Sequence, residues 1–304
     1  MFSASICYKT SFIPSYSKSS VLFMVGFIFY QALPIFLKEG IGFLTGMRWD
    51  YEENIYGILP FIIGTISVTT VTLLIACPIG LFTAIYLAEW APTWAERIMR
   101  PSIELLVGIP SVVYGVFGLY VLGTLFRDHI DPFIDNTLGF IPIFRDVHPE
   151  SGEGILLTAT VLTMMILPTI IALSQESMRA VPREYREGSL ALGATKWETI
   201  KKCVIPAASS GIVAAVVLGM MRAMGETMAV VMLIGNNPGL PDSIFSYVYP
   251  MTSKILNDIG YRVAFDEPRS ALFGIAAVLF VIELIFVALL RYVMKNVNKG
   301  GIQN

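Results

Sequence analysis

Two residues of opposite charge stand inside an otherwise apolar stretch near residue 220. The stretch reads GMMRAMGETMAVVMLIGN, and Arg222 and Glu226 are four residues apart, so a continuous helix would place them one turn apart on one face. A charge within a membrane-length apolar run is costly and usually functional. The guanidinium is a planar fork of donors that suits a tetrahedral oxyanion. The pair is therefore a candidate for substrate contact, and the alternative is a structural ion pair.

A charged segment between two apolar runs, residues 175–206, holds a second group of candidates. Gly193 can adopt the left-handed conformation that ends a helix. Thr195 and Glu198 then form a T-x-x-E capping box, which predicts a second helix that ends before Pro206. We therefore expect a helix–turn–helix at a membrane face, an arrangement that suits docking of a soluble partner.

Sequence signatures of enzymes are absent. The sequence has no G-x-x-x-x-G-K-[ST] motif and no Gly-Lys dipeptide, so it cannot form a P-loop. It also lacks H-E-x-x-H, a CxxC pair and G-x-S-x-G. We expect no catalytic residue, no metal ligand and no cofactor in this chain, and an intramembrane enzyme is disfavoured. An energised transporter built on it would need an ATPase from another polypeptide.

The elements that position these residues belong in a bilayer. Hydrophobic residues make up 55% of the chain and charged residues 14%, and the mean hydropathy is +0.68. Runs of roughly 20 apolar residues match the hydrocarbon thickness. The sequence thus predicts an all-α polytopic membrane protein with six spans, at about 19–37, 57–88, 101–126, 154–174, 206–235 and 270–292.

We expect one membrane domain, residues 19–295, preceded by a mobile N-terminal tail (1–18) and followed by a C-terminal tail (296–304). The first apolar run has no small-residue cleavage site after it, so it is predicted to be a retained span. With both termini in the cytoplasm, thirteen lysines and arginines lie on the cytoplasmic side and seven on the other. The positive-inside rule favours this orientation and makes segment 175–206 cytoplasmic.

The charged segment resembles the EAA loop of ABC-importer permeases, written E-A-A-x3-G-x9-I-x-L-P. Glu187, Gly193 and Pro206 fall at the matching distances, and the departures are conservative in size: Gly188, Ser189, Cys203 and Ile205. Over about residues 38–295 the chain resembles the phosphate ABC transporter permeases of the PstC type. That resemblance rests on four stretches, at 56–92, 104–119, 181–208 and 222–236.

The resemblance implies a type I ABC-importer permease fold and an inner-membrane subunit that imports inorganic phosphate. It implies a PstA-type second permease, a PstB-type ATPase homodimer that binds ATP and Mg, and a PstS-type phosphate-binding protein outside the cell. Membrane lipid is the remaining partner, and no nucleic acid is expected. By the same resemblance, the residues of this chain that couple to the ATPase would be Arg183, Glu184, Arg186, Glu187, Gly188, Ser189, Leu190, Ala191, Gly193 and Ala194.

Two alternatives remain open from the sequence. One is a permease for another oxyanion, such as molybdate, sulfate or phosphonate. The other is a secondary transporter that uses Arg222 and Glu226 as an ion relay, although it would have no ATPase to dock on the loop. A further acid, Glu283, lies in the last span and could face Arg222, the partner permease or lipid.

Overall fold

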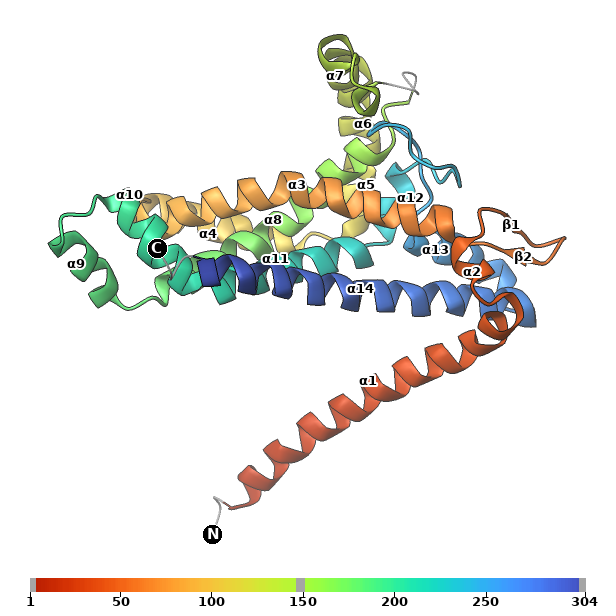
Figure 1. The fold of residues 1–304 in the computed structure, drawn as a ribbon, viewed down its shortest axis with the longest axis horizontal. Coiled ribbons are helices and arrows are strands. Elements are labelled where there is room, and N and C mark those ends of the chain that lie inside the picture. The colour runs from red at the N-terminus through yellow and green to blue at the C-terminus, as the bar shows by residue number, and fades with distance from the viewer. Residues whose placement is uncertain (1–3, 146–150, 301–304) are drawn as a thin grey trace. The chain divides into compact units, whose positions relative to one another are not determined.

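The computed structural model describes residues 4–145 and 151–300, with side chains except at 4–18, 104 and 293–300. The chain divides into two compact units, Met1–Leu59 with Lys254–Val281 and Pro60–Ser253 with Ile282–Asn304. The described part is almost entirely helical (Figure 1). Its elements are α1 (Ala4–Glu39), α2 (Gly42–Thr45), β1 (Trp49–Asp50), β2 (Ile55–Tyr56), α3 (Leu59–Glu89), α4 (Thr93–Gly108), α5 (Ser111–Phe117), η1 (Gly118–Leu122), α6 (Gly123–Leu125), η2 (Phe126–Ile130), α7 (Asp131–Leu138), η3 (Pro142–Phe144), α8 (Ile155–Arg179), α9 (Arg183–Ala191), α10 (Lys196–Thr199), η4 (Ile200–Val204), α11 (Ile205–Gly225), α12 (Met228–Leu233), α13 (Met251–Arg262) and α14 (Asp266–Gly300).

The prediction of an all-helical polytopic membrane protein is confirmed. Among the described residues, five helices are long and apolar enough to cross a bilayer, and a bent pair supplies a sixth candidate. The five are Ser19–Glu39, Leu59–Glu89, Ile155–Arg179, Lys196–Gly225 and Asp266–Tyr292, and the bent pair is Thr93–Gly108 with Ser111–Leu138. The predicted number of spans therefore holds if the bent pair counts as one, but some boundaries need correction.

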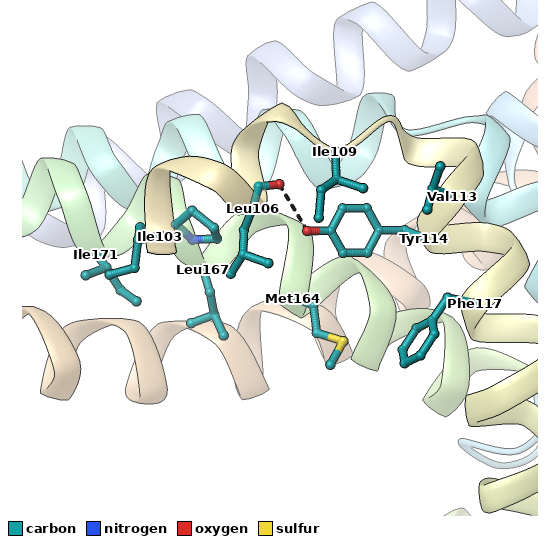
Figure 2. Close-up of a pocket in the computed structure, with 10 residues that line it drawn as sticks. Ile103, Leu106, Ile109, Val113, Tyr114, Phe117, Met164, Leu167 and Ile171 are labelled. Carbon is teal, nitrogen blue, oxygen red and sulfur yellow. Dashed lines mark hydrogen bonds between the residues drawn. The ribbon is translucent and has the colours of Figure 1, made fainter. Parts of the chain in front are cut away.

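The third predicted span, residues 101–126, is not a straight helix. The chain leaves helical geometry at Ile109 (ψ 126°), and the helices on either side of the break differ in direction by 95°. Pro110 is the cause, because it has no N–H for the carbonyl of Leu106 four residues earlier and disfavours helix at the residue before it. The hydroxyl of Tyr114 donates to that carbonyl instead, at 3.0 Å (Figure 2). We call this bend the elbow.

The second helix of the predicted helix–turn–helix does not end before Pro206, which corrects that expectation. It continues through η4 into α11, so that Lys196–Gly225 forms one span. In η4 the N–H of Ile205 donates to the carbonyl of Ile200, five residues back. Pro206 follows directly and has no N–H to donate, so the wider turn accommodates the proline within the continuous span.

The larger unit packs closely around α8. Ile170 of α8 is fully buried between Gly80 of α3 and Gly219 of α11. A Cβ on Gly80 would lie 2.8 Å from Ile170 Cγ2, and one on Gly219 would lie 2.9 Å from Ile170 Cγ1. Small residues at these positions let the three backbones approach closely, as is common between membrane helices. In Figure 1 α8 and α11 run side by side along the bundle.

The smaller unit joins α1 to the first half of α14 through the N–H of Ile35, which donates to the hydroxyl of Ser270 at 3.1 Å. Its two strands pair antiparallel, with Trp49 opposite Tyr56. The ammonium of Lys254 lies 5.0 Å from the ring centroid of Trp49, and burial lowers the pKa of that lysine. These contacts hold the β1–β2 hairpin against α13.

The chain ends differ in part from the predicted tails. Helix α1 begins at Ala4, so residues 4–18 continue the first span as helix, and α14 extends to Gly300. The mobility of residues 1–18 stays a prediction. Residues 1–3, 146–150 and 301–304, which include the ends of both predicted tails, lie outside the described residues.

Tyr114→Phe should destabilise the elbow, because it leaves the Leu106 carbonyl without its side-chain donor in an apolar setting. An unsatisfied buried acceptor costs about 1–3 kcal/mol, so the midpoint of thermal unfolding in detergent should fall. Tyr120→Phe is the matched control, since Tyr120 is 71% exposed. Equal midpoints for the two variants would show that the Tyr114 hydroxyl does not support the bend.

Candidate functional site

The predicted helix–turn–helix forms, and its turn chemistry is confirmed. We call residues 181–204 the α9–α10 hairpin. Gly193 has φ +86°, and no atom lies within 4 Å of where its Cβ would be, so the backbone conformation alone requires glycine. Both hydrogen bonds of the capping box are present, from Glu198 N–H to the Thr195 hydroxyl (3.3 Å) and from Thr195 N–H to the Glu198 carboxylate (2.9 Å).

Arg186 fastens this hairpin to the membrane bundle. Its guanidinium donates twice to the Glu89 carboxylate at the end of α3 (3.2 and 2.8 Å). It also donates to the carbonyls of Met178 (2.8 Å) and Val181 (2.6 Å), where α8 ends. The side chains of Arg186 and Glu89 are only 21% and 10% exposed. Sequence reasoning placed Arg186 on the docking surface, whereas the structure turns its side chain inward, and sequence reasoning missed Glu89.

The second half of the hairpin is also held in place. The ring of Trp197 stacks on Trp90 just beyond α3, with centroids 5.8 Å apart and planes at 21°. The hydroxyl of Thr199 donates to that of Ser189 at 3.0 Å and so links the end of α10 to α9. Ser189, another predicted docking residue, therefore contributes to the internal structure of the hairpin. Contacts at both ends make it a rigid extension of α3 and α8.

The outer surface of the hairpin combines charge with exposed apolar groups. Among the predicted coupling residues the exposed ones are Arg183, Glu184, Glu187, Gly188, Leu190, Ala191 and Gly193, and Ala194 is half-buried. Two apolar residues that sequence reasoning missed join them: Tyr185 is 58% exposed and Leu192 is 91% exposed. The sequence could have indicated both residues, because each is an apolar residue next to a predicted coupling residue (Glu184 or Gly193) in a segment that is otherwise polar. Clustered exposed apolar side chains are typical of protein interaction surfaces.

Arg222 and Glu226 do not share a helix face, which corrects the spacing argument. Helix α11 ends at Gly225, and Glu226 has extended backbone (φ −67°, ψ 132°). The carbonyl of Glu226 accepts a hydrogen bond from the Thr252 hydroxyl at 3.0 Å. Its carboxylate accepts one from the N–H of Ala229 at 3.3 Å and so caps α12. A tertiary contact and a local cap thus replace the predicted continuous helix.

The charged side chains at this break are available for different roles. Among the described residues, Arg222 makes no hydrogen bond or ion pair, and in particular none with Glu226 or Glu283. It is half-buried and interacts electrostatically with the hydroxyl of Tyr114. Glu226 lies beside the buried hydroxyls of Thr65 and Thr69. The arginine can therefore donate to a passing anion, while the glutamate is engaged in local structure.

No group of three or more His, Cys, Asp or Glu side chains gathers as metal ligands would within the part of the chain that the structure describes. The arrangement is one of positioned helices and a half-buried arginine, Arg222. It can dock a partner, transmit movement and contact an anion.

Comparisons with known proteins agree with this arrangement. The family model of the binding-protein-dependent transport system inner membrane component matches residues 76–299. The chain is 41% identical over 271 residues to the probable ABC transporter permease YqgH of Bacillus subtilis, and 36% identical over 271 residues to the phosphate transport system permease PstC of Xylella fastidiosa; each alignment covers 88% of this chain and 82% of the relative. A chain in the crystal structure of a bacterial ABC transporter involved in alginate import has the same fold, with a TM-score of 0.56, 14% identity, and coverage of 96% of this chain and 98% of that chain. This chain therefore belongs to the family of binding-protein-dependent transport system inner membrane components, as a multi-pass permease subunit.

Proposed function

We propose that this chain is the permease subunit of an ATP-driven importer of inorganic phosphate. The observation that carries the proposal is the α9–α10 hairpin, which is rigid, outward-facing and bonded through Arg186 to the ends of α3 and α8. A lever of this kind transmits force only if a soluble partner moves it. Since the sequence has no P-loop, the ATP and Mg would be bound by a separate ATPase.

Phosphate is the substrate that the relatives favour. The curated relatives that are named phosphate permeases include proteins 36% and 34% identical to this chain, from Xylella fastidiosa and Methanocaldococcus jannaschii. Arg222 offers the planar fork that suits a tetrahedral oxyanion. Molybdate, sulfate and phosphonate share that shape, so uptake of radiolabelled phosphate with these anions as competitors is the deciding experiment. A secondary transporter is disfavoured, because the family is one of binding-protein-dependent systems.

The proposed assembly has four kinds of subunit. A PstA-type permease would pair with this chain and complete the translocation path between them. A PstB-type ATPase homodimer would seat the hairpin, and its closure on ATP would move α3 and α8 together. A PstS-type binding protein would deliver phosphate from outside and supply most of the affinity. Contact with Arg222 must then be weak, because a tight site would hold the ion in transit.

Both termini and the hairpin are proposed to be cytoplasmic. A single cysteine at position 190, in a background without the three native cysteines, should resist a membrane-impermeant maleimide in intact cells and react after permeabilisation. Cysteines placed in the loops at 38–56 and 236–253 should react without permeabilisation. Reaction of position 190 in intact cells would reverse the orientation.

Gly193→Val should uncouple ATP hydrolysis from transport, because a β-branched residue at φ +86° is strained by about 1–3 kcal/mol. The α9–α10 turn would open and misplace α9. Disulfide crosslinking from position 190 to the ATPase and phosphate uptake should both fall at least about tenfold. Gly260→Val is the control, since Gly260 is helical in α13 with open space around it and lies outside the hairpin. If Gly193→Val crosslinks and transports like the control, the turn is not needed for coupling.

Arg222→Lys should lower phosphate uptake at least about tenfold despite keeping the charge, because an ammonium lacks the bidentate fork. Arg222→Gln should abolish uptake while the complex still assembles with its ATPase. The double variant Arg222→Met with Glu226→Met should stay inactive, since the two residues form no ion pair whose joint removal could restore structure. Near-normal uptake in the double variant, at matched expression, would instead establish a purely structural pair.

A further inference from the structure

An apolar slot of about 470 Å³ lies on the inner side of the elbow, between α4, α5 and α8. Figure 2 shows Leu106 and Ile109 on one side of it and Met164 and Leu167 of α8 on the other. The hydroxyl of Tyr114 is bonded to the Leu106 carbonyl, so its ring presents an apolar surface to the slot. A phosphate ion has no favourable contact in such a cavity, whereas a hydrocarbon chain does.

A smaller pocket of about 150 Å³ that contains charged side chains, here called the polar pocket, lies next to this slot and nearer the hairpin end of the bundle. Ile103 of α4 lines both cavities. The polar pocket is lined by Arg100 of α4 and by Gln175, Glu176 and Arg179 of α8. Gln175 is 8% exposed, and its amide donates to the carbonyl of Leu87 at 3.5 Å, so it forms a fixed part of the pocket wall.

The charges of the polar pocket are held in position. Arg179 pairs with Glu96 and donates to the carbonyl of Leu87 at 3.1 Å, so its guanidinium is fixed at the pocket wall. Trp94, in the first turn of α4, is 67% exposed, and exposed tryptophans are typical of membrane–water interfaces. The charged lining of the polar pocket and the apolar lining of the slot match what the headgroup and the acyl chain of a lipid would contact.

We propose that α4 and α8 hold one phospholipid with an amine-bearing headgroup. One acyl chain fills the apolar slot, the phosphate diester lies between Arg100 and Arg179, and the ammonium faces the Glu176 carboxylate. Basic pockets between membrane helices commonly bind lipid headgroups. Glu176 selects the zwitterion, because its negative charge would repel both free phosphate and a purely anionic headgroup. The proposal does not rest on the transported substrate.

A lipid in the slot would contact the elbow directly. The α4 helix, the bend at Pro110 and α8 form the walls of the slot, and α8 carries the hairpin at its end. An acyl chain in the slot would replace the missing packing atoms on the inner side of the bend. The lipid would therefore stabilise the elbow in the conformation described here.

The test uses the complete transporter in nanodiscs that contain phosphatidylethanolamine with a photoactivatable diazirine on one acyl chain. After illumination, peptides covering 103–117 and 164–171 should carry the label. Ile103→Trp, which places a bulky ring at the one position that lines both cavities, should reduce labelling at least fivefold. Leu105→Trp is the matched control on the same helix, because Leu105 is 73% exposed and lines neither cavity.

Headgroup recognition has its own readout. Native mass spectrometry of the complex purified in mild detergent should find phosphatidylethanolamine retained, and Arg100→Gln should reduce it at least fivefold. Glu176→Gln should shift the retained lipid toward phosphatidylglycerol. Displacement of the label by millimolar inorganic phosphate would show that the pocket is a free-phosphate site and overturn the proposal. So would crosslinking of a cysteine at 113 or 164 to the second permease in native membranes, which would mean that protein covers the slot.

Discussion

Backbone hydrogen bonding inside the bilayer is the constraint on which the rest of this structure depends. A bilayer offers no water to an unpaired N–H or carbonyl group, so each break in a span requires a substitute partner. At the elbow the hydroxyl of Tyr114 takes the Leu106 carbonyl that Pro110 leaves free. At the end of α11 the Thr252 hydroxyl takes the carbonyl of Glu226. At both of these breaks a side chain is positioned to complete the hydrogen bonding of the backbone.

Hydrogen bonds of this kind also join the hairpin to the bundle. The guanidinium of Arg186 has acceptors in the last residue of α3, in the last turn of α8 and in the segment that follows α8, a set that a lysine could not bond with equal geometry. In the proposed transporter, a displacement of α9 would therefore reach α3 and α8 together. Close packing of Ile170 between these helices and α11 would then pass the displacement along the bundle.

Sequence reasoning succeeded where the determining interactions are local. The capping box and the positive φ of Gly193 depend on residues within one or two turns, and the structure has both. For the roles of Arg186 and Glu226 it failed, because distant residues decide them. The partner of Arg186 is 97 residues away, and the Thr252 hydroxyl that supports the break after α11 is 26 residues from Glu226. Hydropathy predicts the number of apolar runs, but it does not identify the distant side chain whose hydrogen bond stabilises the backbone at a break.

The break after Gly225 also changes which interactions Arg222 and Glu226 can make. On a continuous helix Arg222 and Glu226 would neutralise each other, and the arginine would have little left to offer a substrate. Capping α12 commits the carboxylate to the backbone of Ala229 and removes it from the reach of the guanidinium. Arg222 then remains a half-buried donor without a protein acceptor among the described residues. In the proposed transporter such a cation would favour an anion that binds and leaves, because no described residue competes for the guanidinium and its half-exposure would keep the attraction weak enough for release.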